Sequence, residues 1–439
     1  MAGYVLGNRG FAQIMPVPGV PLLFAELTLA LALPLVLARH TFERTLPFRR
    51  DSLNLAVLLW LVIGTLRIPW DVRTHGFNAL RDFATIYYAL FFFIGQSVAA
   101  HPASLRLLRR TLLAVWFALP VLYFLNLTFP EFFLQRLLFR GTPLFFYKED
   151  LVAAYLIAAV FFLCTEPSAW RLLVAASSYG LAFSINSSRA AILGLVVISG
   201  WWALARRWTP LRLQAALIPA GLVLLLLVAL VQEKPFVESR IYRLYEHVVS
   251  MVDVAGTRSY RHEDRTYVGD NNRFRLVWWR SVAEETLAEA PLLGLGFGAD
   301  LSERFLRVYQ LDLGEDFTTR SPHSIVFTMV GRLGLAGLGT IAFLFLVLCL
   351  RTLRVARHVR AHPEDTPVLG WWSVSWAIFI SGCFGVVLEG PMGAVLFWTS
   401  LGIANATLPA QASAADAIGD PARHETALPD ASSRASLPA

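Results

Sequence analysis

The chain has 439 residues, of which 56% are hydrophobic and only 16% are charged, with a formal net charge of +7. So much apolar surface excludes a soluble globular protein, and we expect the chain to lie in a lipid bilayer. The basic residues stand in short clusters between apolar runs and form no single basic face, which argues against a nucleic-acid partner.

Eleven apolar stretches are long enough to cross a bilayer, whose core takes about 20 residues of helix and slightly fewer in a short span. Residues 1–16 are either a periplasmic arm or a short additional span, and we favour the span. The sequence therefore predicts an all-α, polytopic membrane protein with about 12 transmembrane helices. The eleven stretches lie near residues 17–38, 52–69, 77–98, 111–129, 149–165, 170–186, 190–205, 213–231, 323–350, 368–388 and 392–408.

Arginine clusters occupy every second connection between these stretches. Cytoplasmic loops of membrane proteins carry an excess of Lys and Arg, so we assign the five clusters to the cytoplasm. The alternate connections are poorer in charge, which assigns the long segment after Val231 to the periplasmic side. The clusters are Arg39 to Arg50, Arg106 to Arg110, Arg171, Arg206 to Arg212 and Arg351 to Arg360.

This pattern divides the chain into four parts. Residues 1–231 hold the N-terminal transmembrane helices, and 232–322 form a periplasmic loop domain. Residues 323–408 hold the C-terminal transmembrane helices. The tail, 409–439, is rich in Ala, Pro and Ser and is expected to be a disordered cytoplasmic segment.

The long loop is expected to be helical because apolar residues recur at helical spacing in 241–252 and again in 274–287. Asn271 or Asn272 is expected to cap the second of these helices. The polar, arginine-rich piece before it, 256–272, is the ligand-facing loop of this interpretation. The alternative is a solvated cap with scattered charges.

Several arginines are placed where an anionic ligand would stabilise them. Arg273 and Arg275 open the second loop helix and Arg265 precedes them, although helix starts prefer acidic residues. Arg189 ends a very short turn at the hydrocarbon boundary, where an arginine is costly unless it binds something. The alternative for Arg189 is that its side chain reaches to lipid headgroups.

His323 follows Ser321 and Pro322 at the point where the loop turns into the next span, a typical helix opening. A helix N-terminus disfavours imidazolium, so His323 is a candidate general base. The alternative is an interfacial histidine without a role. Arg81, Lys148 and Asp150 lie at periplasmic ends of other spans, as local ion pairs with a possible role in lining the same cavity.

A metal site is the weaker interpretation of the remaining histidines. His247 and the triplet 262–264 carry suitable ligand types, but adjacent loop residues point in different directions and no i, i+4 ligand pair is present. We therefore expect neither a metal ion nor a cofactor.

Four features together resemble the O-antigen ligases, in the family that also holds the O-antigen polymerases. One of them is the architecture of about twelve spans with one long periplasmic loop late in the chain. The other three are the Ser-Ser-Arg-Ala-Ala segment at 187–191, the Arg275 to Trp279 helix opening followed by Pro-Leu-Leu-Gly-Leu-Gly at 291–296, and His323-Ser324 leading into a glycine-rich helix at 331–337.

Two residues depart from the family pattern. Ser324 stands where Asn is common, and Arg332 occupies a helix position where an acidic or neutral residue is usual. An arginine inside a span needs a partner. Glu389, near the last periplasmic turn, is one candidate for that partner.

The resemblance implies a GT-C-like, metal-independent, inverting glycosyltransferase of the bacterial inner membrane, with its active site on the periplasmic side. It would move a glycan from undecaprenyl pyrophosphate to lipid A-core. Both substrates are lipid-anchored, and their lipid tails would enter between the helices. His323 would be the catalytic base, and Arg189, Arg265, Arg273 and Arg275 would bind the pyrophosphate. The alternatives are an O-antigen polymerase and a lipid-glycan transporter.

Overall fold

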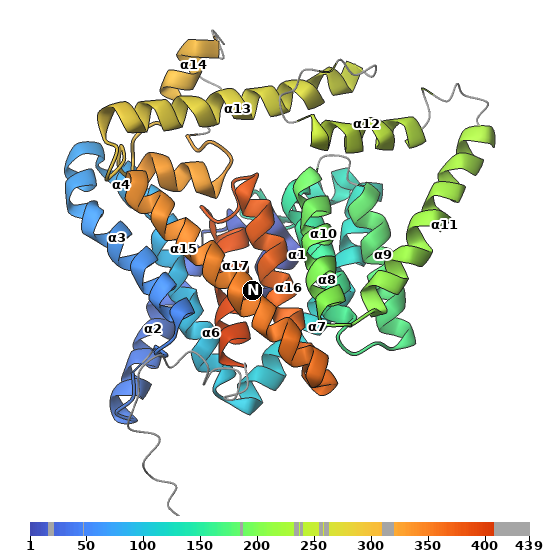
Figure 1. Cartoon of the computed structure of the whole chain (residues 1–439), viewed down its shortest axis with the longest axis horizontal. Coiled ribbons are helices and arrows are strands. Elements are labelled where there is room, and N and C mark those ends of the chain that lie inside the picture. Colours follow the sequence, from blue (N-terminus) through green and yellow to red (C-terminus); the bar gives the residue numbers. More distant parts are fainter. Residues whose placement is uncertain are drawn as a thin grey trace, which may run out of the picture.

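The computed structural model describes residues 1–15, 22–46, 48–184, 188–231, 237, 240–253, 258, 263–309 and 320–407. Helices dominate this part of the chain, so the prediction of an all-α, polytopic membrane protein is confirmed (Figure 1). The strands described are β1 (Leu138–Phe139) and β2 (Thr142–Pro143). The helices are α1 (Ala2–Ala12), α2 (Phe24–Phe42), α3 (Ser52–His75), α4 (Phe77–Asp82), α5 (Ala84–Tyr87), α6 (Phe91–Ala99), α7 (Pro102–Thr128), α8 (Glu149–Leu163), α9 (Ala169–Ser184), α10 (Arg189–Leu204), α11 (Thr209–Val231), α12 (Arg240–Val252), α13 (Glu263–Glu289), α14 (Glu303–Tyr309), α15 (Ile325–Ala361), α16 (Thr366–Cys383) and α17 (Pro391–Ala406).

Six helical segments in the described ranges are long and apolar enough to cross a membrane. Each of the eleven predicted stretches coincides with a helical segment, and α1 falls within 1–16. The 11 residues of α1 rise by about 16 Å, roughly half of a hydrocarbon core. The number of crossings therefore stays a prediction. The six segments are Phe24–Phe42, Ser52–His75, Phe77–Ala99, Pro102–Thr128, Thr209–Val228 and Ile325–Ala361.

The centre of the bundle is built from α8, α16, α17 and α6. Every residue of α8 from Leu151 to Leu163 is buried, as expected of a helix that is apolar on all sides. The backbones of α6 and α17 meet closely, because a Cβ at Gly402 would lie 2.0 Å from the carbonyl oxygen of Phe92. Small residues allow this kind of close helix contact in membranes.

Helices α12 and α13 lie across one end of the bundle, crosswise to the spanning helices, and α14 lies on the outer side of α13 (Figure 1). Helices α13 and α14 share a small apolar core, in which the indole of Trp278 stacks on the ring of Phe305 with their centroids 5.0 Å apart. Val282 and Leu301 complete this core. The long loop thus contributes a helical layer above the bundle end.

Residues 291–298, which we call the glycine-rich loop, follow α13 and pack against α15. The amide of Leu295 donates to the carbonyl of Gly331 at 2.7 Å, and the amide of Leu335 donates to the carbonyl of Pro291 at 2.8 Å. Gly334 interrupts α15 with a positive φ of 60°. The interrupted helix exposes backbone groups, and the loop satisfies them.

Two predicted helix starts are wrong. Helix α13 begins at Glu263, so Asn271 and Asn272 lie inside it and most of the described part of the predicted ligand-facing loop is helical. Acidic residues at 263 and 264 suit the positive end of a helix better than two asparagines followed by arginines. Helix α15 begins at Ile325, so Pro322 is not its first residue. Residues 254–257 and 259–262 lie outside the described ranges.

Candidate active site

A pocket of about 200 Å³ lies where α13 crosses the start of α10. It is assembled from four chain segments that are far apart in sequence: the start of α8, the start of α10, the middle of α13 and the end of α16. Polar and apolar groups share its surface, as in typical ligand sites. The lining residues are Asp150, Ser188, Arg189, Ala190, Leu193, Asn272, Arg275, Leu276, Trp279, Ser381 and Phe384.

The spacing of Arg275 and Trp279, an Arg-x-x-x-Trp motif, places both side chains on one face of α13. Asn272, Arg275 and Trp279 are three and four residues apart, so their side chains lie on the same side of the helix. All three line the pocket. The motif therefore places a cation and an indole in one site, and Asn272 extends the same face by one turn.

Arg189 enters the pocket from the first residue of α10. Ser188 caps this helix by accepting a hydrogen bond from the amide of Ala191 at 3.3 Å. The Nη1 atom of Arg189 donates to Oδ1 of Asn272 at 2.5 Å. The amide nitrogen of Asn272 in turn donates to the carbonyls of Ser250 and Asp253 at 2.8 and 2.9 Å. Asn272 thus holds Arg189 and the end of α12 together.

The predicted pair of Lys148 and Asp150 is present, with Nζ and Oδ2 3.2 Å apart. Nζ of Lys148 also donates to the carbonyl of Val386 at 2.9 Å, which ties the start of α8 to the loop after α16. Asp150 lines the pocket. The pair therefore sets one wall of the site.

His323 lies just before α15 and outside it. Its φ of 53° is in the left-handed region. Non-glycine residues adopt this region rarely, and those that do are concentrated at functional sites. The indole of Trp279 donates to the carbonyl of Pro322 at 2.7 Å, and the ring of Trp278 packs edge-on against the imidazole with centroids 5.4 Å apart. Two adjacent tryptophans of α13 thus hold the histidine segment.

Burial, together with the nearby charges of Arg275 and Lys148, lowers the pKa of His323 to about 4, while Asp150 acts in the opposite direction. Burial also lowers the pKa of the Arg275 guanidinium, with Asp150 acting in the opposite direction. The imidazole of His323 is therefore neutral at pH 7 and lies within electrostatic reach of the pocket's cations. The sequence suggested that a helix N-terminus keeps this imidazole neutral, whereas in the structure burial and neighbouring cations do so.

Among the predicted site residues whose side chains the structure describes, Arg81 and Arg273 do not line this pocket. The side chain of Arg273 is exposed, on α13 next to Asn272. Arg265 lies in α13, but its side chain is outside the described part of the chain, as are those of His247 and residues 262–264. Arg81 is 60% exposed and faces Asp82 at 4.0 Å.

Part of the chain is similar to a known protein family. Residues 172–344 match a family model described as O-antigen ligase. This segment belongs to the O-antigen ligase family. A search of curated proteins found no match to the chain.

The O-antigen ligase segment supplies most of the pocket, including Arg189, Arg275 and the neighbouring His323. Three lining residues come from outside it, namely Asp150, Ser381 and Phe384. The site therefore depends on α8 and α16 as well as on the matched segment. No sequence signal pointed to Ser381 or Phe384, whereas the helical spacing from Arg275 would have pointed to Asn272.

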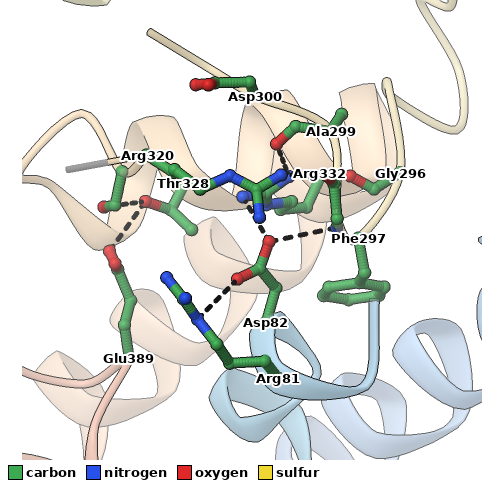
Figure 2. A network of polar contacts seen from close by, with 12 residues as sticks. Arg81, Asp82, Gly296, Phe297, Ala299, Asp300, Arg320, Thr328, Arg332 and Glu389 are labelled. Carbon is green, nitrogen blue, oxygen red and sulfur yellow. Dashed lines mark hydrogen bonds and ion pairs between the residues drawn. The ribbon is translucent and has the colours of Figure 1, made fainter. Parts of the chain in front are cut away.

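Within the O-antigen ligase segment, Arg332 is the buried charge for which the sequence suggested Glu389 as one candidate partner. Its Nη2 atom lies 2.7 Å from Oδ2 of Asp82, and its Nη1 atom donates to the carbonyl of Gly296 at 3.0 Å (Figure 2). It also donates to the carbonyl of Ala299. Asp82 accepts a second hydrogen bond, from the amide of Gly298 at 3.0 Å. The ion pair thus fixes the glycine-rich loop between α4 and α15.

Glu389 stands on the other side of Arg332. It accepts a hydrogen bond from Oγ1 of Thr328 at 2.8 Å, and the hydroxyl of Thr328 lies 3.2 Å from that of Ser321 (Figure 2). Desolvation raises the pKa of Glu389, while hydrogen bonds from Ser321 and Thr328 and the charges of Arg332 and Lys148 act against this shift. Glu389 therefore connects the surroundings of Arg332 to the segment Ser321 to His323.

A second ion pair holds the same loop from α3. Nε of Arg67 lies 2.8 Å from Oδ1 of Asp71, and the other oxygen of Asp71 accepts from the amide of Phe297 at 2.7 Å. Arg67 also donates to the carbonyl of Gly294 at 3.0 Å. Arg67 and Asp71 are four residues apart in an otherwise apolar stretch, so the sequence alone could have predicted this ion pair.

Proposed function

We propose that the chain is a GT-C-like O-antigen ligase of the bacterial inner membrane, which transfers a glycan from undecaprenyl pyrophosphate to a sugar hydroxyl of lipid A-core. The observation that carries this proposal is the meeting of Arg189 and Arg275 in one pocket, with a neutral His323 beside them. Membership of residues 172–344 in the O-antigen ligase family supports the same reaction class.

In this proposal the two pocket arginines bind the pyrophosphate of the donor. Negative charge develops on the leaving diphosphate as the glycosidic bond breaks, and preorganised cations in a partly dry site stabilise that charge by several kcal/mol. Arginine is suited to this role because its planar fork binds phosphate oxygens in pairs. The positive charge comes from side chains, so the reaction requires neither a metal ion nor a cofactor. Arg273, two positions from Arg275 on α13, would act at the margin of the site, and Arg265 stays a candidate for binding the pyrophosphate.

His323 is the proposed general base. It accepts the proton of the acceptor hydroxyl as that oxygen attacks the anomeric carbon from the face opposite the diphosphate, so the configuration inverts. A pKa near 4 suits a neutral imidazole but makes it a weak base. A bound diphosphate would offset the charges of Arg275 and Lys148 and raise this pKa, so that binding of the donor would activate the base.

The proposed orientation places the pocket at the periplasmic surface of the membrane. The five arginine-rich connections then lie in the cytoplasm, in agreement with the positive-inside rule. Both substrates of the proposed reaction are lipid-anchored, and a pocket formed between helix ends and a crosswise helix suits headgroups that cannot leave the bilayer.

Purified protein tests the reaction directly. In detergent, we expect it to join an isolated lipid-linked glycan to lipid A-core and to release undecaprenyl pyrophosphate, as seen by a shift of the acceptor on a gel. A product in which glycan units are joined on the carrier lipid would identify a polymerase. The absence of any new glycosidic bond, with movement of the lipid-glycan across sealed vesicles, would identify a transporter.

Deletion of the gene gives a second test in the cell. A ligase deletion leaves lipid A-core without a ladder and lets full-length polymer accumulate on the carrier. A polymerase deletion leaves core that carries a single repeat.

A further inference from the structure

Among the described side chains of α12, apolar residues on one face are exposed and polar residues on another face are buried. Tyr245, Val248 and Val252 are 57%, 49% and 80% exposed, and they are three or four residues apart along one face. Glu246 and Ser250, which are four residues apart on another face, are 5% and 0% exposed. In water this arrangement is unfavourable, since the apolar face should be the buried one.

The position of α12 identifies what covers its apolar face. It contacts α11, the helix before it, and in Thr209–Val228 of α11 the most apolar window has no buried residue. Such a helix is surrounded by lipid. Val231, which ends α11, is 82% exposed, and α12 lies at the level of this end of α11 in Figure 1. Figure 1 shows α12 lying crosswise over the ends of the spanning helices, as a helix in the plane of a membrane surface would.

We propose that α12 is an interfacial helix whose face of Tyr245, Val248 and Val252 is embedded at the boundary between headgroups and acyl chains. Amphipathic helices bind membranes in this way, with the apolar face a few ångströms below the headgroups. Tyrosine is enriched at this depth because its ring is apolar and its hydroxyl is polar. Only the statement that this leaflet is the periplasmic one rests on the proposed function.

The embedded helix is tied to the candidate active site. The side-chain amide of Asn272 donates to the carbonyls of Ser250 and Asp253 at the end of α12, and it accepts from Arg189. The depth of α12 in the leaflet therefore sets the depth of Asn272 and of the Arg189 guanidinium. Helix α12 thus holds the pocket at headgroup level.

Spin labels on full-length protein in phospholipid nanodiscs test this inference. A background with Cys164, Cys349 and Cys383 replaced receives one cysteine at Val248, Val252 or Arg280. Arg280 is the matched control, since it lies on the neighbouring α13 and its side chain is 81% exposed. At positions 248 and 252 we expect collisions with oxygen to exceed those with a water-soluble nickel complex by several-fold, relative to position 280.

Two results would overturn the inference. Nickel collisions at positions 248 and 252 equal to those at 280 would mean that the face is in water. A dipolar distance between labels at 252 in samples with two copies per disc would mean that a second copy covers it. Neither readout depends on glycan transfer, so a protein without ligase activity still gives an answer.

Discussion

Arg189 and Asn272 are 83 positions apart in the chain, yet Nη1 of the arginine donates to Oδ1 of the asparagine at 2.5 Å. The arginine begins a spanning helix, and the asparagine lies within the crosswise helix α13. This bond therefore fixes a cation of the membrane bundle against the layer that covers it. The candidate site exists only where the two parts meet.

Replacing Asn272 with Ala should weaken glycan transfer by about tenfold to a hundredfold. A hydrogen bond to a charged group contributes about 1.5–3 kcal/mol, and the substitution removes the acceptor that Asn272 offers to the Arg189 guanidinium. The rate of transfer by purified protein measures this effect. Arg280→Gln is the control, because Arg280 lies on the same helix with its side chain 81% exposed, and it should keep the parental rate. An unchanged rate in Asn272→Ala would mean that the bond does not serve the reaction.

Replacing Asp82 with Asn should destabilise the fold strongly. It leaves Arg332, whose side chain is 4% exposed, without its carboxylate, and breaking a buried pair in this way costs about 3–5 kcal/mol. The thermal unfolding temperature in detergent should fall, and the double variant Asp82→Asn/Arg332→Met should recover part of the loss. The exposed neighbour offers the control, since Arg81→Gln should change stability by no more than about 1 kcal/mol. If the double variant were less stable than Asp82→Asn, the pair would not be the reason for the loss.

Two glycines of α15 should respond in opposite directions to alanine. Gly334 has a φ of 60°, and a Cβ there would lie 2.5 Å from the carbonyl oxygen of Pro291. Left-handed backbone alone costs an alanine about 1–2 kcal/mol, so Gly334→Ala should lower the unfolding temperature. At Gly339, in the same helix, a Cβ meets no atom within 4 Å, and Gly339→Ala should keep or raise it. Equal unfolding temperatures for the two variants would show that the joint between α15 and the glycine-rich loop is not strained.

The pH dependence of transfer should reflect the lowered pKa of His323. The free enzyme keeps a neutral imidazole above about pH 4, so kcat/KM should be level from pH 8 to about pH 5 and fall below that as imidazolium forms. Donor binding offsets nearby cations, so the fall in kcat should begin at a higher pH. Arg275→Gln removes one of these cations and should move the fall in kcat/KM to higher pH, whatever its absolute rate. An inflection near pH 6.5 in the parent kcat/KM profile would contradict this account.

Much of the fold follows from the sequence because apolar length and helix are nearly equivalent in a membrane. The stretch at 149–165 predicted α8, and the stretch at 323–350 predicted most of α15. Helix starts outside the membrane were less predictable. Asn271 and Asn272 have good capping chemistry, but the acidic residues eight positions earlier begin the helix.

The site was predictable where its residues share one helix face or one motif, as with Arg275 and Trp279. It was not predictable where tertiary structure alone decides. Arg273 and Arg275 look equivalent in sequence, but they are two positions apart on α13, and only Arg275 lines the pocket. Glu389 was one candidate for the partner of Arg332, whereas Asp82 provides the ion pair, because both Asp82 and Arg332 bind the backbone of the glycine-rich loop.

Single-turnover transfer by the His323→Gln variant tests the central claim most directly. Donor binding to this variant is measured separately, with the lipid-linked glycan in detergent, and folding is checked by its unfolding temperature. The account predicts that the variant binds the donor with nearly parental affinity, because Arg189 and Arg275 remain, while the rate of bond formation falls by about a hundredfold or more through loss of the base. Transfer at the parental rate by a folded His323→Gln protein would contradict the account.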